Sequence, residues 1–397
     1  MAKLTIEDVA LKDKRVVMRV DFNVPIKDGV ITDDNRIVQA LPSINYVIEN
    51  GGLLILLSHL GRPKGEPNPD FSLKPVADYL SKKVNTTVHF ADDCVGEVAV
   101  NAVNKASFGE IVVLENVRFH AGETKNDPEL SKAFASLGDV FINDAFGSSH
   151  RAHCSVAGIT DHLQPAAAGY LLEKEIKFLS DSINAPKRPF IAVLGGAKVS
   201  DKIGVIRNLV SKVDAIIVGG GMTYTFYKAK GLPIGKSLLE DDKVELAAEL
   251  MKEAEANNVK LLLPVDSVVS QEFNNDAPFK TVGEDGIEDG WMALDIGEKS
   301  IQLFADEVRN AKTVIWNGPM GVFEMSNFSK GTFAVAEAMA EATKKGAVSI
   351  IGGGDSASAI KKAGLENDVS HVSTGGGASL EYLEGKELPG IACLTDK

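Results

Sequence analysis

The sequence has few cysteines, and their spacing gives no sign of covalent or metal cross-links. Its three cysteines, Cys94, Cys154 and Cys393, lie far apart in a chain of 397 residues and form no CxxC pair. Disulfide frameworks and thiolate zinc sites are built from paired or clustered cysteines. We therefore expect neither of them, and we expect a reducing compartment.

Positive charge is also scarce, since the formal net charge is −13. Nucleic acids and anionic membranes bind basic surfaces, so we expect no nucleic-acid partner and no membrane partner. No apolar run is long enough to span a bilayer, and the N-terminal "MAKLTIEDVALKDKRVV" lacks the apolar core of a signal peptide. These features predict a cytoplasmic protein in which any basic pocket is local.

Familiar nucleotide and zinc signatures are missing as well. The sequence has no GxxxxGK[ST], so it is not a P-loop enzyme, and "GGAKVSDK" at Gly195–Lys202 lacks the spacing of a GxGxxG dinucleotide fingerprint. His150 and His153 belong to no HExxH pattern. We therefore expect no zinc site at these histidines.

What the sequence does have is an alternation of short apolar runs with amphipathic helical patterns. The runs are "RVVMRV", "LLILLS", "IVVLEN", "VFIND", "FIAVLGG", "AIIVGGG", "LLLPVD", "TVIWNG" and "SIIGGG". Continuous apolar runs of this length are typical of parallel strands covered by helices on both faces. Because 397 residues suit two domains of ordinary size, we predict an α/β protein with two mainly parallel sheets.

The ends of the predicted strands differ between the two halves of the chain. Early strands end in charged, imidazole or amide residues, which are Asp21, His59, Glu115, Asn116 and Asp144, whereas later strands end in Gly195, Gly219, Gly318 and Gly352. Ligands of open α/β sheets bind beyond the carboxyl ends of the strands, so the two halves are expected to bind different groups. A predicted helix from Tyr170 to Ile183, which ends before Pro186, separates them. We place the domains at residues 1–170 and 186–387, with a connecting helix over 171–185.

Basic residues recur at the expected ligand edge of the first half. The segments that carry them are "RVDFNVP", "DDNRI", "SHLGRP", "ENVRFH" and "NDAFGSSHRAH", and the residues are Arg36, His59, Arg62, Arg118 and Arg151. Any one of them alone is more typical of a surface residue or an ion pair. Together they predict an anion site, because guanidinium groups bind phosphate and carboxylate in a bidentate way. Asp21 and Asn23 can hold polar oxygens of the same anion.

Glycine-rich turns mark the second half. They are "GGAKVSDK", "VGGGM", "WNGPMGVFE", "GGGDS" and "STGGGAS". Such turns bring backbone N–H groups close to phosphates, and a helix N-terminus favours negative charge. Lys198 and Lys202 would share one face if a helix began directly after the first turn. The alternative for "GGGDS" is a tight connection capped by Asp355 or Ser356, and the alternative for the lysines is a solvated surface.

Taken together and in order, seven segments closely resemble the phosphoglycerate kinase family over essentially the whole chain. They are "RVDFNVP", "SHLGRP", "NDAFGSSHRAH", "GGAKVSDKI", "WNGPMGVFE", "IIGGGDS" and "HVSTGGGASLEYLEG". The resemblance implies two similar-sized, Rossmann-like lobes joined by a hinge helix, with residues 388–397 packing back on the first lobe. It also implies a monomeric glycolytic enzyme that transfers a phosphoryl group reversibly from 1,3-bisphosphoglycerate to ADP, giving 3-phosphoglycerate and ATP, with Mg²⁺.

The resemblance further implies a role for each matching residue. Asp21 and Asn23 would hold the glycerate, with Arg36 at the reacting carboxyl. The residues around the 3-phosphate would be His59, Arg62, Arg118 and Arg151. On the second lobe the nucleotide would contact Lys202, Glu324, Gly353, Gly354, Asp355 and Ser356, with Asp355 at the Mg²⁺. The catalytic groups would be Arg36, Lys198 and Gly376.

Two other functions stay open at this point. One is another acyl-phosphate kinase, for example one that acts on acetate, although so small a substrate needs fewer basic residues. The other is a two-lobed protein that closes on a small anion without catalysis. Such binding proteins are mostly exported, which the expected lack of a signal peptide argues against.

Overall fold

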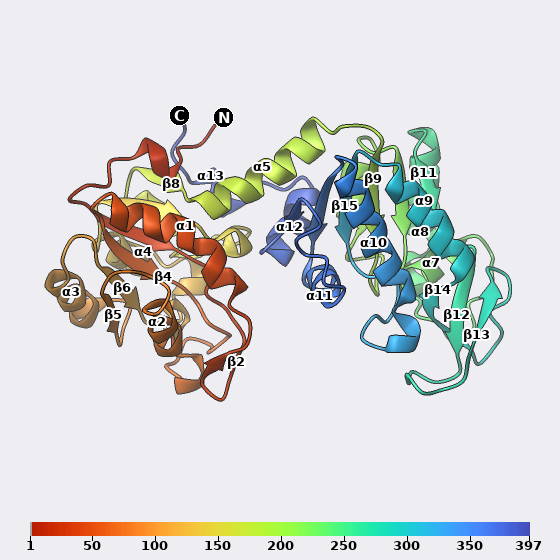
Figure 1. Cartoon of the computed structure of the whole chain (residues 1–397), viewed down its shortest axis with the longest axis horizontal. Coiled ribbons are helices and arrows are strands. Elements are labelled where there is room, and N and C mark those ends of the chain that lie inside the picture. The colour runs from red at the N-terminus through yellow and green to blue at the C-terminus, as the bar shows by residue number, and fades with distance from the viewer. Residues whose placement is uncertain (1) are drawn as a thin grey trace. The chain divides into compact units, whose positions relative to one another are not determined.

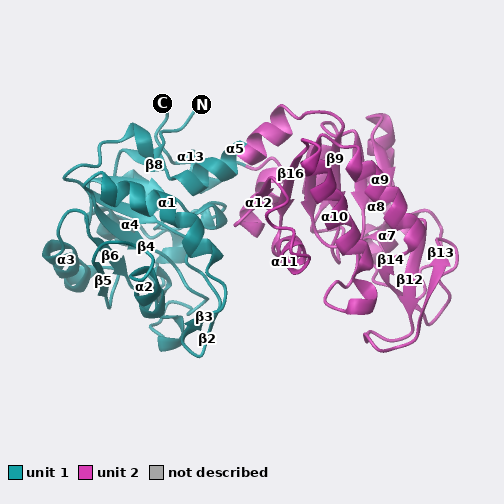
Figure 2. Ribbon diagram, viewed as in Figure 1, with its two compact units in different colours: residues 1–177, 387–397 teal, residues 178–386 magenta. Residues whose placement is uncertain are grey.

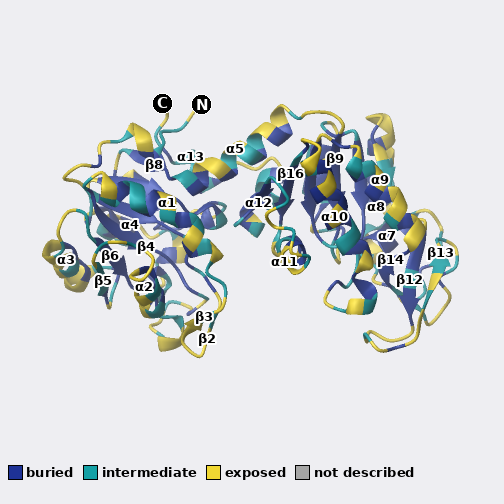
Figure 3. Cartoon of the chain, viewed as in Figure 1, coloured by how far each residue is buried: buried dark blue, intermediate teal, exposed yellow. Residues whose placement is uncertain are grey.

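The computed structural model describes residues 2–397. Contacts within the chain divide it into two units: residues up to Lys177 together with Glu387–Lys397, and Phe178–Lys386 (Figure 2). Each unit has a sheet flanked by helices (Figure 1), with the strands buried and the outer helix faces exposed (Figure 3). Across residues 2–397, no helix combines the length and the apolar character needed to cross a membrane.

Unit 1 is built on a sheet of six parallel strands in the order β5-β6-β4-β1-β7-β8. Their bounds are Arg15–Arg19 (β1), Leu53–Leu57 (β4), Val88–Ala91 (β5), Ile111–Leu114 (β6), Val140–Asn143 (β7) and Ala166–Ala168 (β8). Val17 in β1 pairs with Ile55 on one side and with Phe141 on the other. All three are fully buried, as expected of central strands covered on both faces.

Helices and short turns complete unit 1. The helices are α1 (Asn35–Glu49), α2 (Lys74–Leu80), α3 (Gly96–Lys105), α4 (Pro128–Ala135) and α13 (Pro389–Ala392), beside a small hairpin of β2 (Ile26–Lys27) and β3 (Val30–Ile31). The 3-10 turns are η1 (Ile6–Asp8), η2 (Pro69–Phe71), η3 (Val117–Phe119), η4 (Glu123–Lys125), η5 (Phe146–Ser148) and η6 (Gly158–Asp161). The C-terminal segment joins this unit through hydrogen bonds from Gly390 N to Ser149 O (2.8 Å) and from Leu4 N to Thr395 O (2.8 Å).

Unit 2 repeats the plan with six parallel strands in the order β11-β10-β9-β15-β16-β17. They are β9 (Phe190–Leu194), β10 (Ala215–Val218), β11 (Lys260–Leu262), β15 (Thr313–Asn317), β16 (Val348–Gly352) and β17 (His371–Val372). A second, antiparallel sheet is formed by β12 (Asp266–Ser270), β13 (Phe279–Gly283) and β14 (Met292–Ile296). Every apolar run singled out in the sequence overlaps a strand, so the α/β prediction with two mainly parallel sheets is confirmed.

The helices of unit 2 alternate with its strands along most of the chain. They are α6 (Ile203–Leu209), α7 (Thr223–Ala229), α8 (Val244–Ala256), α9 (Glu298–Arg309), α10 (Lys330–Lys344), α11 (Gly354–Lys362) and α12 (Gly376–Leu383), with 3-10 turns η7 (Asp241–Lys243) and η8 (Ser326–Phe328). Trp316, fully buried in β15, donates its indole N–H to Gly318 O at 2.7 Å. That bond ties the strand to the turn that follows it.

One helix, α5 (Tyr170–Asn184), runs from unit 1 into unit 2. Its first turn is held by Asp144 at the end of β7, whose Oδ1 accepts hydrogen bonds from Leu171 N (2.8 Å) and Leu172 N (3.2 Å). Further along, the Phe178 ring stacks on His371 of unit 2 with ring centroids 4.8 Å apart. The predicted helix from Tyr170 to Ile183 is confirmed.

Candidate active site

The predicted anion-binding residues of unit 1 follow the carboxyl ends of neighbouring strands. The strands β6, β4, β1 and β7 lie next to one another in the sheet and run in one direction. Asp21 and Asn23 follow β1, His59 and Arg62 follow β4, Arg118 follows β6, and Arg151 follows β7. Parallel strands bring their carboxyl ends to one edge, so this topology gathers segments that are distant in sequence.

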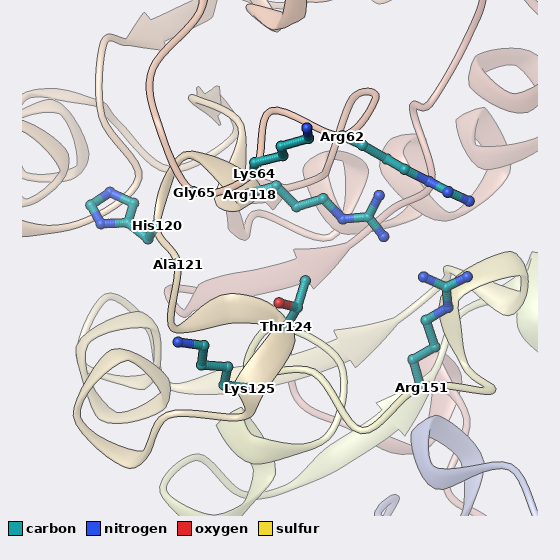
Figure 4. Close-up of a pocket in the computed structure, with 9 residues that line it drawn as sticks. All are labelled: Arg62, Lys64, Gly65, Arg118, His120, Ala121, Thr124, Lys125 and Arg151. Atoms are coloured by element: carbon teal, nitrogen blue, oxygen red, sulfur yellow. The ribbon is translucent and has the colours of Figure 1, made fainter.

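Three of the predicted arginines line one pocket of about 480 Å³, which we call the basic pocket. The guanidinium groups of Arg62, Arg118 and Arg151 face the same open region (Figure 4). The other lining residues are Lys64, Gly65, His120, Ala121, Thr124 and Lys125. None of these nine residues is acidic. In a chain with a net charge of −13, such a local concentration of positive charge can bind a multiply charged anion.

Arg36, Asp21 and Asn23 do not line the basic pocket but form a connected group near it. Arg36 Nη1 donates to Asp21 Oδ1 and to Asn23 O, both at 3.1 Å. The side-chain oxygen of Asn23 accepts from Gly61 N (2.8 Å), and Gly61 O accepts from Arg118 Nη1 (2.8 Å). The turn at Gly61 therefore links this group to an arginine of the pocket. The carboxylate of Asp21 fixes the direction of the Arg36 guanidinium.

His59 is buried, with 6% of its surface exposed, and it is held by an arginine. Arg19 Nη2 lies 3.1 Å from His59 Nδ1. A guanidinium can only donate, so Nδ1 accepts and the imidazole proton is assigned to Nε2. Burial, followed by the charges of Arg19, Arg118 and Arg36, holds the pKa of His59 well below its usual range. His59 is therefore neutral, and it can offer a hydrogen bond from Nε2 but no charge.

Arg19 is a supporting residue that the sequence analysis did not single out. Its side chain is fully buried, and Nε donates to Ser155 Oγ (2.8 Å), which in turn donates to Glu123 Oε1 (2.6 Å). Burial and the charges of Arg19 and Arg151 lower the pKa of Arg118 to about 10, so Arg118 remains charged. Arg19 is the first residue of "RVDFNVP" and the last residue of β1, so the quoted segment contained it although no role was given to it.

The basic pocket also contains residues that no strand-end pattern marked. Lys64 belongs to the same turn as Arg62, and that continuity is a signal that the sequence offered. Thr124 and Lys125 lie in η4 (Glu123–Lys125), which follows no strand directly. Only the tertiary structure brings them to the pocket.

Most glycines of the unit 2 turns allow the turns to pack on one another. A Cβ added to Gly195 would collide with Pro319 O, and one added to Gly220 would lie 2.6 Å from Gly196 N. Close backbone contact therefore explains the glycines at these positions without a ligand. Gly354 differs, because a Cβ there would meet nothing within 4 Å.

The turn between β16 and α11, which we call the open turn, leaves space beside Gly354. Gly353, with φ at 90°, is the N-cap of α11 and contributes no side-chain cap, so the alternative in which Asp355 or Ser356 caps the helix is wrong. Ser356 is buried, and its hydroxyl accepts from Gly318 N at 2.6 Å, whereas Asp355 is exposed. The first N–H groups of α11 are therefore available to an anion. A Cβ on Gly376 would lie 3.2 Å from Gly354 N, so the start of α12 adjoins this turn.

Lys198 and Lys202 do not share a helical face, and that expectation is wrong. The helix α6 begins only at Ile203, and Glu240 binds both the amide (3.0 Å) and the hydroxyl (2.5 Å) of Ser200. These bonds compete with an earlier helix start. As a result Lys198 is exposed, whereas Lys202 is buried with its amine donating to Asn317 Oδ1.

Lys202 lies near the open turn, and burial lowers its pKa while the charges of Asp201 and Asp355 oppose that shift. Asn317, which accepts the hydrogen bond from Lys202, lies beside the open turn, because a Cβ added to Gly353 would be 3.3 Å from its side chain. Lys202, Gly353, Gly354, Asp355 and Gly376 are thus brought together. Glu324 is exposed between β15 and η8. Among residues 2–397, no hydrogen bond or ion pair joins it to the residues of the open turn.

Comparison with known proteins places this geometry in a family. The sequence profile "Phosphoglycerate kinase" matches residues 6–386. The phosphoglycerate kinase of Chloroherpeton thalassium is 57% identical to the chain, and the match covers 100% of both sequences. The phosphoglycerate kinase of Clostridium novyi is 58% identical, and the match covers 100% of the chain and 99% of that protein. The structure of phosphoglycerate kinase from Coxiella burnetii is similar over 98% of both chains, with 43% identity and a TM-score of 0.90. That from Pyrococcus horikoshii is similar over 98% of both chains, with 32% identity and a TM-score of 0.84. The chain belongs to the phosphoglycerate kinase family, and it is therefore a glycolytic phosphotransferase whose acceptor is a carboxyl group.

Proposed function

We propose that unit 1 binds 3-phosphoglycerate or 1,3-bisphosphoglycerate through the basic pocket. The single observation that carries this proposal is that Arg62, Arg118 and Arg151 converge on a pocket that also contains two lysines and no acid. Guanidinium groups bind phosphate oxygens in pairs, which fixes the orientation of the bound phosphate as well as its position. The 3-phosphate would anchor the substrate there.

The rest of the substrate would lie along the Asp21 group. Asp21 and Asn23 would accept or donate hydrogen bonds with the glycerate, and His59 would donate from Nε2. Arg36, which Asp21 already orients, would place its guanidinium at the reacting carboxyl. Pre-oriented donors of this kind need little rearrangement when charge develops.

On unit 2 we propose that ATP or ADP binds at the open turn. Its phosphates would be held by Lys202 and by the backbone N–H groups of Gly353 and Gly354, at a helix start whose N-cap residue supplies no side-chain cap. Ser356 would contribute its amide, since its hydroxyl is already bound to Gly318. Glu324 would bind the ribose hydroxyls.

Phosphoryl transfer would then need alignment and positive charge more than a nucleophilic side chain. In the direction from ATP, a carboxylate oxygen of 3-phosphoglycerate attacks the γ-phosphorus and the bond to the β,γ-bridging oxygen breaks, releasing ADP. Charge spreads over the three outer oxygens of the transferring group. Arg36, Lys198 and the amide of Gly376 would stabilise that charge, and loss of one such donor typically costs about 3 to 4 kcal/mol.

We propose Asp355 as the protein ligand for Mg²⁺. It is an exposed carboxylate at the start of α11, and Mg²⁺ at nucleotide sites takes one or two carboxylates together with phosphate oxygens and water. When bound, the ion neutralises phosphate charge. The residues present therefore fit the ion.

The two substrates would be held on different units, so transfer would need the units to bring the two reacting groups into line. We propose that α5 takes part in the hinge, because it is attached to unit 1 through Asp144 and to unit 2 through Phe178. Closure would also exclude water, which otherwise hydrolyses the acyl phosphate. We further propose that the chain acts in the cytoplasm as a monomer, without a nucleic-acid or membrane partner.

A coupled assay that follows ADP formation tests the proposal. With ATP, 3-phosphoglycerate and Mg²⁺ we expect turnover, which should stop when Mg²⁺ is removed and return when it is restored. Turnover with acetate in place of 3-phosphoglycerate would favour another acyl-phosphate kinase. Binding of 3-phosphoglycerate without any turnover would favour the non-catalytic alternative.

A further inference from the structure

Three potential metal ligands lie together, and none of them has a substrate role proposed above, although His120 also lines the basic pocket. Asp93 and Cys94 lie just after the end of β5, and His120 follows β6 and the 3-10 turn η3. Because β5 and β6 are adjacent parallel strands, their carboxyl ends lie at the same edge of the sheet. A carboxylate oxygen, the thiol sulfur and an imidazole nitrogen of these residues all lie within 4.8 Å of one another.

The cluster is already ordered by its own contacts. His120 Nε2 lies 2.7 Å from Asp93 Oδ1, and the Cys94 amide donates to the same oxygen at 2.7 Å. Cys94 is 1% exposed, whereas the side chains of His120 and Asp93 are 33% and 42% exposed. An ion can therefore enter from the Asp93 and His120 side and meet a thiol at the protected inner end.

We propose that Asp93, Cys94 and His120 form a binding site for Zn²⁺, with water as the fourth ligand. A set of one sulfur, one nitrogen and one oxygen ligand suits this borderline ion better than Mg²⁺ or Ca²⁺, which prefer oxygen alone. Zinc bonds of about 2.0 to 2.3 Å in a tetrahedron separate the ligands by roughly 3.3 to 3.8 Å. Small side-chain rotations bring atoms within 4.8 Å of one another to that spacing.

An ordinary ion pair between Asp93 and His120 is the competing explanation. The chain contains a natural comparison, since His89 Nε2 and Glu110 Oε2 lie 2.9 Å apart with no thiol assigned to them. The Cys94 sulfur distinguishes the two places.

Cysteine spacing cannot reveal such a site. It predicted no thiolate zinc site because no second cysteine lies nearby in sequence. The site proposed here has one cysteine, and its histidine comes from a different strand end. It is also separate from the nucleotide residues, which lie in unit 2.

Metal binding by the purified full chain, stripped with a chelator, tests the proposal. Titration with Co²⁺ as a spectroscopic probe should produce a thiolate charge-transfer band that saturates at one ion per chain. Zn²⁺, added in competition with a chromophoric chelator, should displace it. Cys94→Ser should abolish the band, and His120→Gln should weaken Zn²⁺ binding at least about tenfold, because even outer-shell partners are worth that much.

Two variants act as matched controls. His89→Gln removes the comparison histidine, and Cys393→Ser removes another thiol, so both should bind Zn²⁺ like the wild type. Absence of the charge-transfer band, or equal Zn²⁺ affinity in His120→Gln and His89→Gln, would overturn the proposal. If Cys94→Ser fails to fold, the Zn²⁺ affinity of His120→Gln, at a partly exposed residue, is the deciding measurement. Failure of the kinase assay would leave this measurement unaffected.

Discussion

At the scale of single residues, burial separates side chains that meet a ligand from those that support them. Arg62 and Arg151 are exposed in the basic pocket, whereas Arg19 is fully buried and holds the neutral His59 in one tautomer. The difference matters for mutagenesis. Removing an exposed arginine leaves no cavity and no unpaired buried charge, so its effect reports on binding.

We expect Arg151→Ala to weaken binding of 3-phosphoglycerate by about 1.5 to 3 kcal/mol, the usual value of hydrogen bonds to a charged group. Binding of ADP should stay unchanged, because Arg151 belongs to unit 1. Calorimetric titration with each ligand measures both effects. Arg207→Ala, at an exposed arginine of α6, is the matched control and should affect neither. Equal losses for both ligands in Arg151→Ala would contradict the division of binding between the units.

Lys198→Ala and Lys202→Ala should have different kinetic effects. The exposed Lys198 is proposed to contact the transferring group, so its loss should lower kcat with little change in the nucleotide KM. Lys202 is buried beside Asn317 and the open turn, so its loss should mainly raise the nucleotide KM. Steady-state kinetics, with circular dichroism to confirm folding, measure both. Wild-type rates in both variants would mean that the lysines are only solvated surface residues.

At the scale of elements, α5 begins on a carboxyl group that is costly to ionise. Burial raises the pKa of Asp144 from its usual value near 3.8 to about 7. A carboxyl whose pKa is higher in the folded than in the unfolded protein stabilises the fold at low pH. That stabilisation is lost as the pH rises from about 4 through about 7.

Asp144→Asn should therefore reduce the loss of stability between pH 4 and pH 7. The amide oxygen can still accept from Leu171 N and Leu172 N, but the group no longer ionises. At pH 8 the gain relative to wild type is at most about 4 kcal/mol, the equivalent of the full pKa shift. Thermal unfolding midpoints at pH 5 and pH 8 measure it. Burial also raises the pKa of Asp295 to about 7, so the variant keeps the part of the pH dependence of stability that comes from Asp295. If stability depended on pH in the same way in Asp144→Asn and in the wild type, ionisation of Asp144 would not cause the loss of stability.

The glycine turns allow a paired prediction. Gly195→Ala should destabilise unit 2 by about 1 to 3 kcal/mol, because the new methyl group collides with Pro319 O. Gly354→Ala should leave stability unchanged or slightly raised, since the methyl group enters open space in a helix. It should nevertheless weaken ATP binding by crowding the open turn. Unfolding midpoints and ATP titrations measure the two effects, and the reverse pattern would contradict the proposed roles.

Elements with continuous apolar runs were predictable, and those without them were not. The strands β12, β13 and β14 escaped the pattern, because "DSVVS", "FKTVG" and "MALDI" mix polar with apolar residues. Such strands belong to an antiparallel sheet with a partly exposed face. The helix start considered directly after the first glycine turn fails for a similar reason. The partner that prevents it, Glu240, is remote in sequence.

At the scale of the whole molecule, catalysis requires that both substrates reach one another. We expect the radius of gyration in small-angle X-ray scattering to fall only when 3-phosphoglycerate and a nonhydrolysable ATP analogue are both bound. Either ligand alone should leave the radius of gyration unchanged. Arg151→Ala, at the same ligand concentrations, should not close fully. A radius that is identical in all four states of the wild type would argue against hinge closure.

The sequence by itself determined the α/β class, the connecting helix and the membership of the family. It could do so because apolar periodicity and short motifs are local properties of the chain. It also named the arginines of the basic pocket, since each of them follows a strand end. Only the tertiary structure decided that Lys64, Thr124 and Lys125 line that pocket, that Arg19 fixes the tautomer of His59, and that Cys94 faces His120. These contacts join segments that are distant in sequence. They are created by strand order and side-chain burial, which no local pattern encodes.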